Sequence, residues 1–174
     1  MKFLLAILAV SIFAHSWSQS PDDYVKSIER LRSKGKLTAK SSIDKTFVGS
    51  LTAYYDKDSL VLITSLTDAE AAGTETLYFL QKGVLTKAFV MEAIFNASDE
   101  WTEYFSKHKA ADKCYSCHGK KNCIVTEFTF GEKPTVVRAE NKKNVELSMD
   151  ERDQMTRELI KTCKQLKVLS KELQ

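Results

Sequence analysis

The sequence predicts a single α+β domain, in which a roughly six-stranded antiparallel sheet is packed against an N-terminal and a C-terminal helix. Three observations predict this class. Runs rich in β-branched and aromatic residues follow one another from residue 46 to residue 95, with short turn-like clusters between them. Apolar residues recur at helical spacing near both ends of the mature chain. The length of 174 residues is enough for one core, and Pro and Gly are too scarce for long disordered linkers.

The first twenty residues have the composition of an export signal. Lys2 gives a positive start, residues 3–14 form a short apolar run, and Ser16 and Ser18 place small residues where a signal peptidase reads them. We expect residues 1–18 to be a cleaved signal peptide and residues 19–174 to form the mature domain, periplasmic or secreted. No segment after residue 20 is apolar for long enough to span a membrane.

The first helix of the mature chain is expected over residues 22–35. Asp22 or Asp23 can cap it, Tyr24, Ile28 and Leu31 lie on one face, and Gly35 suits its C-terminal end. Residues 37–45 are predicted to be a polar connection.

Six strands should follow in an antiparallel meander, with one face of the sheet exposed to solvent (a wet face). Turn-forming residues separate them, and Gly83 supplies the positive φ of a tight turn. The expected strands are residues 46–55, 59–66, 74–81, 84–95, 123–130 and 135–140, with Glu75 and Glu127 facing solvent. Residues 96–113 read as a helix leading into a cysteine cluster.

The C-terminal helix is the clearest element. Ser148 and Glu151 have the spacing of a capping box. An apolar stripe at helical spacing should pack on the sheet, and it consists of Met155, Leu159, Cys163 and Leu166.

The four cysteines carry the strongest hint of function. Cys114, Cys117 and Cys123 lie together in "KCYSCHGKKNC", and Cys163 lies on the last helix. An even number of cysteines in an exported protein favours disulfides, here one bridge within the cluster and one from the cluster to Cys163. The bridge to Cys163 would hold the last helix in place and typically contribute about 2–4 kcal/mol, and the bridge within the cluster would fix the conformation of its loop.

The same cluster allows a second interpretation. Cys114, Cys117 and His118 form the pattern C-x-x-C-H, and "CYSCHG" resembles the haem-attachment segment of c-type cytochromes. The resemblance covers about 20 residues and implies thioether bonds from Cys114 and Cys117 to one haem, with His118 as an iron ligand. His108 is a candidate for the second axial position. The resemblance does not explain Cys123 and Cys163.

Two further interpretations of the cluster stay open. A zinc site could draw on Cys114, Cys117, His118 and Cys123, although adjacent ligands fit one tetrahedral ion poorly. A redox-active C-x-x-C pair would normally follow a strand and open a helix, whereas this cluster is expected after a helix and before a strand.

Composition narrows the function further. The net charge is +3 without a basic stripe, so a nucleic acid is a poor candidate for a partner. No hydrolase, metalloprotease or phosphate-loop motif occurs. The strand-rich middle of the chain loosely resembles uncharacterised exported bacterial proteins with a twisted antiparallel sheet. We expect a non-catalytic binding or structural protein for a protein or small-molecule ligand, without a cofactor unless the C-x-x-C-H segment carries haem.

Overall fold

A computed structural model describes residues 19–44, 49–69, 72–94, 123–132, 134–140 and 143–173. The expected signal peptide, the expected helix over residues 96–113 and most of the cysteine cluster lie outside these ranges.

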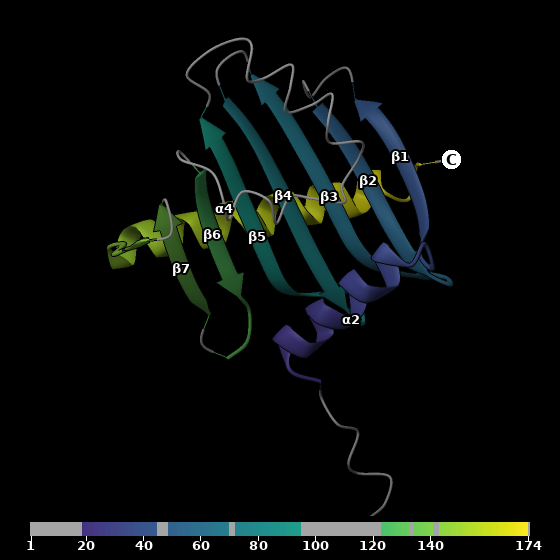
Figure 1. Cartoon of the computed structure of the whole chain (residues 1–174), viewed down its shortest axis with the longest axis horizontal. Coiled ribbons are helices and arrows are strands. Elements are labelled where there is room, and N and C mark those ends of the chain that lie inside the picture. The colour runs from purple at the N-terminus through teal and green to yellow at the C-terminus, as the bar shows by residue number, and fades with distance from the viewer. Residues whose placement is uncertain are drawn as a thin grey trace, which may run out of the picture.

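The described part of the chain is one antiparallel sheet between two helices (Figure 1). The eight described strands pair in sequence order, so that β2 to β7 each pair with the strands before and after them, and β1 and β8 form the two edges. Helix α2 lies in front of the sheet in Figure 1 and helix α4 lies behind it. In chain order the elements are α2 Pro21–Ser33, β1 Thr38–Asp44, β2 Gly49–Asp56, β3 Ser59–Ala69, β4 Ala72–Gln81, β5 Val84–Ile94, β6 Cys123–Thr129, β7 Thr135–Glu140, β8 Lys143–Val145 and α4 Met149–Leu169. The predicted α+β class, antiparallel sheet and two packed helices are confirmed.

The prediction of six strands is wrong, because the sheet has two more at its edges. β1 occupies most of the stretch expected to be a polar connection, and the three-residue β8 was not predicted. Both strands are polar and pair on one side only, so they lack the apolar alternation from which a half-buried strand is recognised. Pairing with β2 and β7 decides their conformation.

Helix α2 begins one residue earlier than expected. Its N-cap is Ser20, whose hydroxyl accepts a hydrogen bond from the Asp23 amide at 3.2 Å, with Pro21 in the first turn. The expectation that Asp22 or Asp23 caps the helix is therefore wrong. Both carboxylates lie in the first turn, where they complement the positive end of the helix dipole. The C-terminal end is as predicted, with Gly35 at a φ of +64° just after the helix.

Helix α4 matches its prediction closely. Ser148 and Glu151 form a complete capping box, and the expected stripe packs on the sheet. Two hydrogen bonds hold its C-terminal end: Tyr55 of β2 donates to the carbonyl of Ser170 at 3.0 Å, and Lys167 donates to the carbonyl of Gly83, in the β4–β5 turn, at 2.7 Å.

Each face of the sheet has its own hydrophobic core. The α4 side buries residues that include Ile63, Leu80 and Phe128, and the α2 side buries Leu62, Leu77 and Phe79 with Tyr24, Val25 and Ile28. The prediction of one wet face is therefore wrong, since a helix covers part of each face. Both sets of alternate residues in the central strands are largely apolar, and this is the pattern of strands that are covered on both faces.

Candidate functional site

The cysteine cluster falls mostly in a part of the chain that the structure does not describe. Cys114, Cys117, His118 and the candidate distal ligand His108 lie outside the described residues. Cys123 is the first residue of β6, and its backbone pairs with Ala93 of β5. The structure therefore places one end of the cluster at the end of the sheet where β5 stops and β6 begins, between two interior strands.

The connection that carries the cluster differs in length from all the others between the strands. Residues 95–122 join β5 to β6, whereas the remaining connections have two to five residues. β5 and β6 are neighbouring antiparallel strands, which two residues are enough to join. The sheet topology therefore does not require a connection of 28 residues.

The fourth cysteine lies in the core. Cys163 is 3% exposed and carries a free thiol in the structure, between α4 and the sheet. Burial raises the pKa of this thiol to about 11, against a small opposing effect of Lys167. A thiol with so high a pKa and so little access to solvent reacts slowly with oxidants and alkylating agents.

Cys163 faces a buried group of hydroxyls on the sheet. Tyr78 of β4 is 2% exposed and shares hydrogen bonds with Thr76 and Ser65. Burial, reinforced by the nearby Cys163, raises the pKa of the Tyr78 phenol to about 12, so the phenol stays protonated. The group supplies neutral hydrogen-bond donors and acceptors and no acid or base that works near neutral pH.

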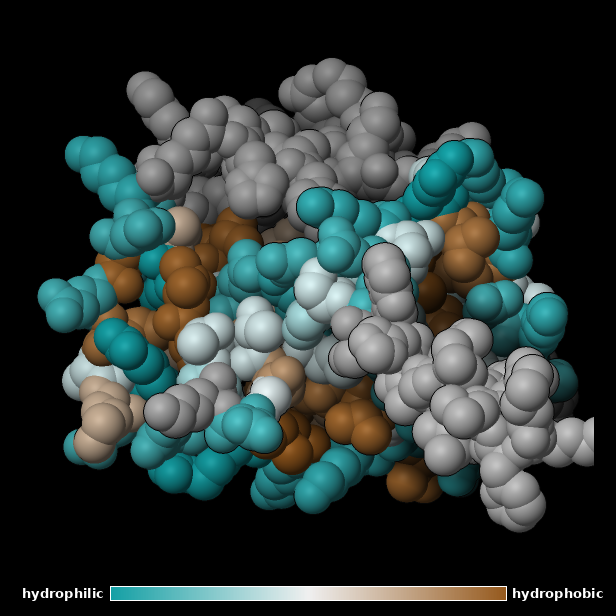
Figure 2. All heavy atoms as spheres, turned by 90° about the horizontal axis from the view of Figure 1, so that it is seen from below, coloured by the Kyte–Doolittle hydropathy of each residue, from teal (hydrophilic) through white to brown (hydrophobic). Residues whose placement is uncertain are grey.

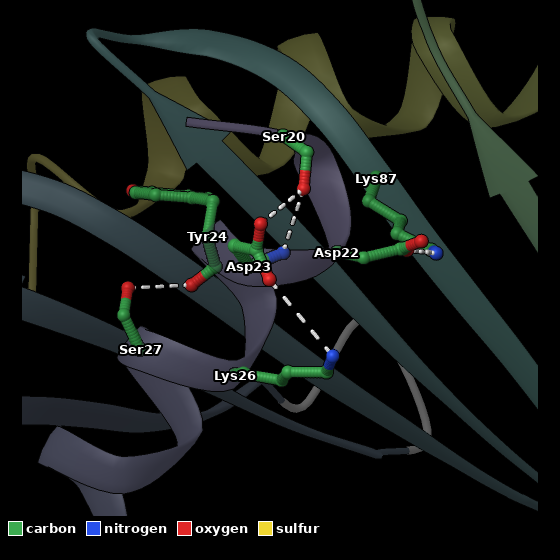
Figure 3. A network of polar contacts seen from close by, with 7 residues as sticks. All are labelled: Ser20, Asp22, Asp23, Tyr24, Lys26, Ser27 and Lys87. Carbon is green, nitrogen blue, oxygen red and sulfur yellow. Dashed lines mark hydrogen bonds and ion pairs between the residues drawn. The ribbon is translucent and has the colours of Figure 1, made fainter. Parts of the chain in front are cut away.

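An ion cluster centred on the buried Lys87 joins α2 to the sheet, and Figure 3 shows its contact with Asp22. Lys87 of β5 is 5% exposed, and its ammonium group ion-pairs with Asp22 of α2 and, at 2.5 Å, with Glu127 of β6. Burial opposes the charge on Lys87, but its two hydrogen-bonded carboxylates outweigh burial and raise the pKa of the lysine. Hydrogen bonding to Lys87 lowers the pKa of Asp22. Glu127 was expected to face solvent, and its side chain is 40% exposed while it binds Lys87.

A second ion cluster lies under the C-terminal half of α2. Arg32 binds Glu29 at 3.0 Å, and its guanidinium lies 5.9 Å from the centre of the Tyr54 ring. Glu75 of β4 interacts electrostatically with both. Burial, as the largest effect, raises the pKa of Glu75 to about 7, while Arg32 acts to lower it and Glu29 to raise it. Glu75 was expected to face solvent, whereas its side chain is partly buried on the face of the sheet that α2 covers.

Sequence reasoning missed that Lys87 is buried and that Glu75 is partly buried, although one signal was present. In β5 the alternation places Lys87 on the same face as Phe89 and Met91. In β4 it places Glu75 on the same face as Leu77 and Phe79. A single charge on an otherwise apolar strand face indicates a buried, paired group once both faces of the sheet are known to be covered.

The face of the protein in Figure 2 shows no single large patch of apolar residues. Seen from the end with the β2–β3 and β4–β5 turns, hydrophobic side chains of the described residues show in separate places between hydrophilic ones (Figure 2). The large hydrophobic residues that are most exposed are Val84 of β5, Val137 of β7, and Met149 and Val168 near opposite ends of α4. Scattered exposure of this kind is ordinary for a folded protein.

Neither a metal centre nor a membrane-spanning helix occurs among the described residues. Within them, no three His, Cys, Asp or Glu side chains gather as metal ligands would. The same residues include no helix with the length and apolar character needed to cross a bilayer. Comparison of the chain with models of known families, with curated proteins and with solved structures finds no match.

Proposed function

We propose that the protein is an exported binding protein whose sheet and two helices form a rigid framework for the β5–β6 connection, residues 95–122. The observation that carries the proposal is the length of this connection between two neighbouring strands. Connections beyond about 12–15 residues are uncommon in compact domains and usually carry function. Binding residues are also often found on loops that a rigid scaffold holds in place.

The framework has the features that such a role needs. Strands β5 and β6, from which the connection departs, are interior strands of the sheet with a partner on each side. Their ends therefore provide fixed anchor points. The ligand would be a protein or a small molecule, and the proposal assigns no catalytic residue.

In this proposal the cysteine cluster stabilises the connection with one disulfide. Cys163 is buried and has a free thiol, so the bridge would join two of Cys114, Cys117 and Cys123. A bridge over so few residues would restrict the local conformation of the connection more than it would stabilise the whole fold.

The alternative is a monohaem c-type protein that uses Cys114, Cys117 and His118. The length of the β5–β6 connection also favours this candidate, because a covalently bound haem needs surrounding chain that the connections of two to five residues do not supply. This candidate would be an electron carrier or a haem-binding protein.

Counting thiols in protein exported from a haem-maturing host distinguishes the candidates. The protein is denatured and alkylated without reduction, and its intact mass and visible spectrum are recorded. With one disulfide in the cluster we expect two alkylated thiols, four after reduction, and no Soret band.

Each other result contradicts the disulfide proposal in a recognisable way. A Soret band, one added haem mass and two alkylated thiols both before and after reduction would establish the haem alternative. Four alkylated thiols before reduction would exclude a disulfide. None before reduction would place Cys163 in a second bridge.

A second experiment tests the framework. Residues 95–122 are replaced with Asn-Gly, a sequence that favours tight hairpin turns. We expect the shortened protein to unfold cooperatively, with a circular dichroism spectrum still dominated by the sheet and two helices. Loss of cooperative unfolding would show that the connection is part of the fold, and the proposal would fail.

A further inference from the structure

The C-terminal half of α4, the β4–β5 turn and the edge strand β1 bring a group of lysines together. Lys167 donates a hydrogen bond to the carbonyl of Gly83 in the turn, 84 positions away in sequence. From β1, Lys40 donates to the carbonyl of Leu173, just after the helix, at 3.5 Å. Residues three or four apart share one side of a helix, so further lysines follow the outward side of α4. The resulting lysine surface consists of Lys40, Lys82, Lys161, Lys164, Lys167 and Lys171, of which all but Lys167 are exposed.

The lysine surface carries an excess of positive charge. Residues 159–173 contain four lysines and one acidic residue, Glu172, whereas residues 149–158 contain four acidic and two basic residues. Among the described residues the lysines that form salt bridges are Lys26 and Lys87, and both lie elsewhere. The positive charge is therefore concentrated at one end of α4 and is not neutralised by salt bridges with described residues.

The helix dipole explains only part of this arrangement. Lysines stabilise the C-terminal end of a helix, but the effect is confined to the last turn. Of the lysines of α4, Lys167 lies in the last turn, while Lys161 and Lys164 lie further from the helix end. Lys82 is not in a helix, and its φ of 53° is one that asparagine or glycine would adopt with less strain in such a turn.

The β2–β3 turn lies at the same end of the sheet, because β2 and β4 run in the same direction. Its Lys57 also has a positive φ, of 55°, but Asp56 and Asp58 flank it. This turn adds no net positive charge, so the lysine surface is centred on α4 and the β4–β5 turn.

Two exposed valines lie within the lysine surface. Val84 follows Gly83 and is 64% exposed, and Val168 follows Lys167 and is 59% exposed. The hydrogen bond between Lys167 and Gly83 brings both valines to the same part of the molecule. Cations combined with exposed aliphatic side chains match the boundary between anionic headgroups and acyl chains in a bilayer.

We propose that the lysine surface binds a bilayer surface that carries anionic lipid headgroups. Protein–protein interfaces are enriched in arginine and aromatic residues and depleted in lysine. The negative potential of an anionic bilayer attracts lysines without requiring hydrogen bonds of fixed geometry. Because lysine supplies every positive charge of this surface, its chemistry favours a lipid surface over an acidic protein.

Binding at this surface would turn the β5–β6 connection away from the bilayer. β5 runs from Val84, beside the lysine surface, to Ile94, and Figure 1 shows its two ends at opposite ends of the sheet. A strand of this length spans roughly 30 Å. The connection would thus stay accessible to its ligand. This consequence rests on the proposed function, whereas lipid binding itself does not.

Sedimentation of the exported protein with lipid vesicles tests the proposal. Vesicles of neutral phosphatidylcholine are compared with vesicles that also contain an equal amount of anionic phosphatidylglycerol. We expect binding to the anionic vesicles only, and weaker binding as the salt concentration rises, because salt screens exposed charges. Equal binding to both kinds of vesicle, or binding to neither, would overturn the proposal.

Matched double variants locate the bound surface. Lys161→Gln with Lys164→Gln should weaken binding to anionic vesicles roughly twenty-fivefold, at about fivefold for each lysine. Lys26→Gln with Lys143→Gln is the control, because it changes the net charge equally on α2 and β8, and it should bind nearly as the wild type does. All four side chains are exposed, so we expect both variants to fold. Equal weakening in the two variants would show that net charge alone drives binding, which contradicts the proposal.

A substitution in the β4–β5 turn separates binding from stability. Lys82→Asn supplies a residue that the backbone of this turn favours, so we expect a higher Tm together with about fivefold weaker binding to anionic vesicles. A variant that is more stable and binds as tightly as the wild type would overturn the assigned surface.

Lysine acylation locates the surface in the unmodified protein. On anionic vesicles we expect mass spectrometry to show protection of Lys82, Lys161 and Lys164, with Lys26 and Lys143 still labelled. Identical labelling with and without vesicles would overturn the proposal. Binding to soluble polyglutamate without binding to vesicles would also overturn it, in favour of an acidic protein partner.

Discussion

The ammonium group of Lys87, on β5, ion-pairs with the carboxylate of Asp22, in the first turn of α2. The two residues are 65 positions apart in sequence, and Glu127 of β6 binds the same ammonium group. Lys87 is almost fully buried, whereas the side chains of Asp22 and Glu127 remain 67% and 40% exposed. The lysine thus crosses the apolar layer under α2, and its charge meets both partners at the margin of that layer.

Removal of the Lys87 charge should destabilise the protein. We expect Lys87→Met, which keeps most of the apolar stem, to lower the free energy of unfolding by about 1–3 kcal/mol, because charge-assisted hydrogen bonds are lost. Chemical denaturation measures the change, and a double-mutant cycle with Asp22→Asn isolates the pair. Lys26→Met is the control, since Lys26 and its partner Asp23 are exposed and 3.9 Å apart. Equal stability of the two lysine variants would contradict this assignment.

The thiol of Cys163 should be protected in the native protein. In a variant with Cys114, Cys117 and Cys123 changed to Ser, we expect a thiol reagent to react rapidly only in denaturant, because Cys163 is buried and the pKa of its thiol is raised to about 11. The time course of labelling with a chromogenic disulfide reagent gives the result. Rapid labelling without denaturant would show that α4 does not cover the sheet at this position.

Gly49 should tolerate no side chain. A Cβ atom at this position would lie 2.0 Å from the carbonyl oxygen of Leu66 on β3, so β2 and β3 would have to separate locally. We expect Gly49→Ala to cost about 2 kcal/mol or more in unfolding free energy, a range typical of overpacking. Gly131→Ala is the matched control, because nothing lies within 4 Å of its added Cβ. Thermal unfolding of both variants measures the difference. A similar Tm for the two would contradict the close approach of Gly49 to the Leu66 carbonyl.

The capping box of α4 should contribute measurably to stability. The Ser148 hydroxyl accepts a hydrogen bond from the Glu151 amide at 3.3 Å, and the Glu151 carboxylate accepts one from the Ser148 amide at 2.8 Å. We expect Ser148→Ala to lower the free energy of unfolding by about 1 kcal/mol. Lys164→Ala, on the exposed side of the same helix, should change it by less than about 0.5 kcal/mol. Denaturation midpoints compare the two, and an effect of Ser148→Ala no larger than the control would mean that the cap is not stabilising.

Local signals made much of the fold predictable. The tight turn at Lys82-Gly83 is recognisable because Gly83 accepts a positive φ, and the structure gives it a φ of +77°. The same holds for the capping box and apolar stripe of α4, in which hydrogen bonds and packing follow a spacing of three or four residues. In each case the interacting groups lie within a few residues of one another.

The edge strands and the charged clusters could not be predicted in this way. β1 reads as a polar connection because its conformation comes from hydrogen bonds to β2 and not from its own side chains. Asp22 was expected to be a cap, yet its partner Lys87 comes from a strand that only the folded sheet brings under α2. Glu75 was expected in solvent for the same reason, since α2 covers it from a distant part of the sequence.

The sequence alone predicts the α+β class, the six strands from β2 to β7, the helix ends marked by Gly35 and Ser148, and the position of the C-x-x-C-H pattern. These features depend on composition, alternation and capping, which act over a few residues. The packing of distant elements was needed to show that both faces of the sheet are covered, that Cys163 is buried, and that Lys87 is buried and Glu75 partly buried beneath α2. Burial and charge pairing depend on which distant elements meet, and that is settled by the packing of two helices on opposite faces of one sheet.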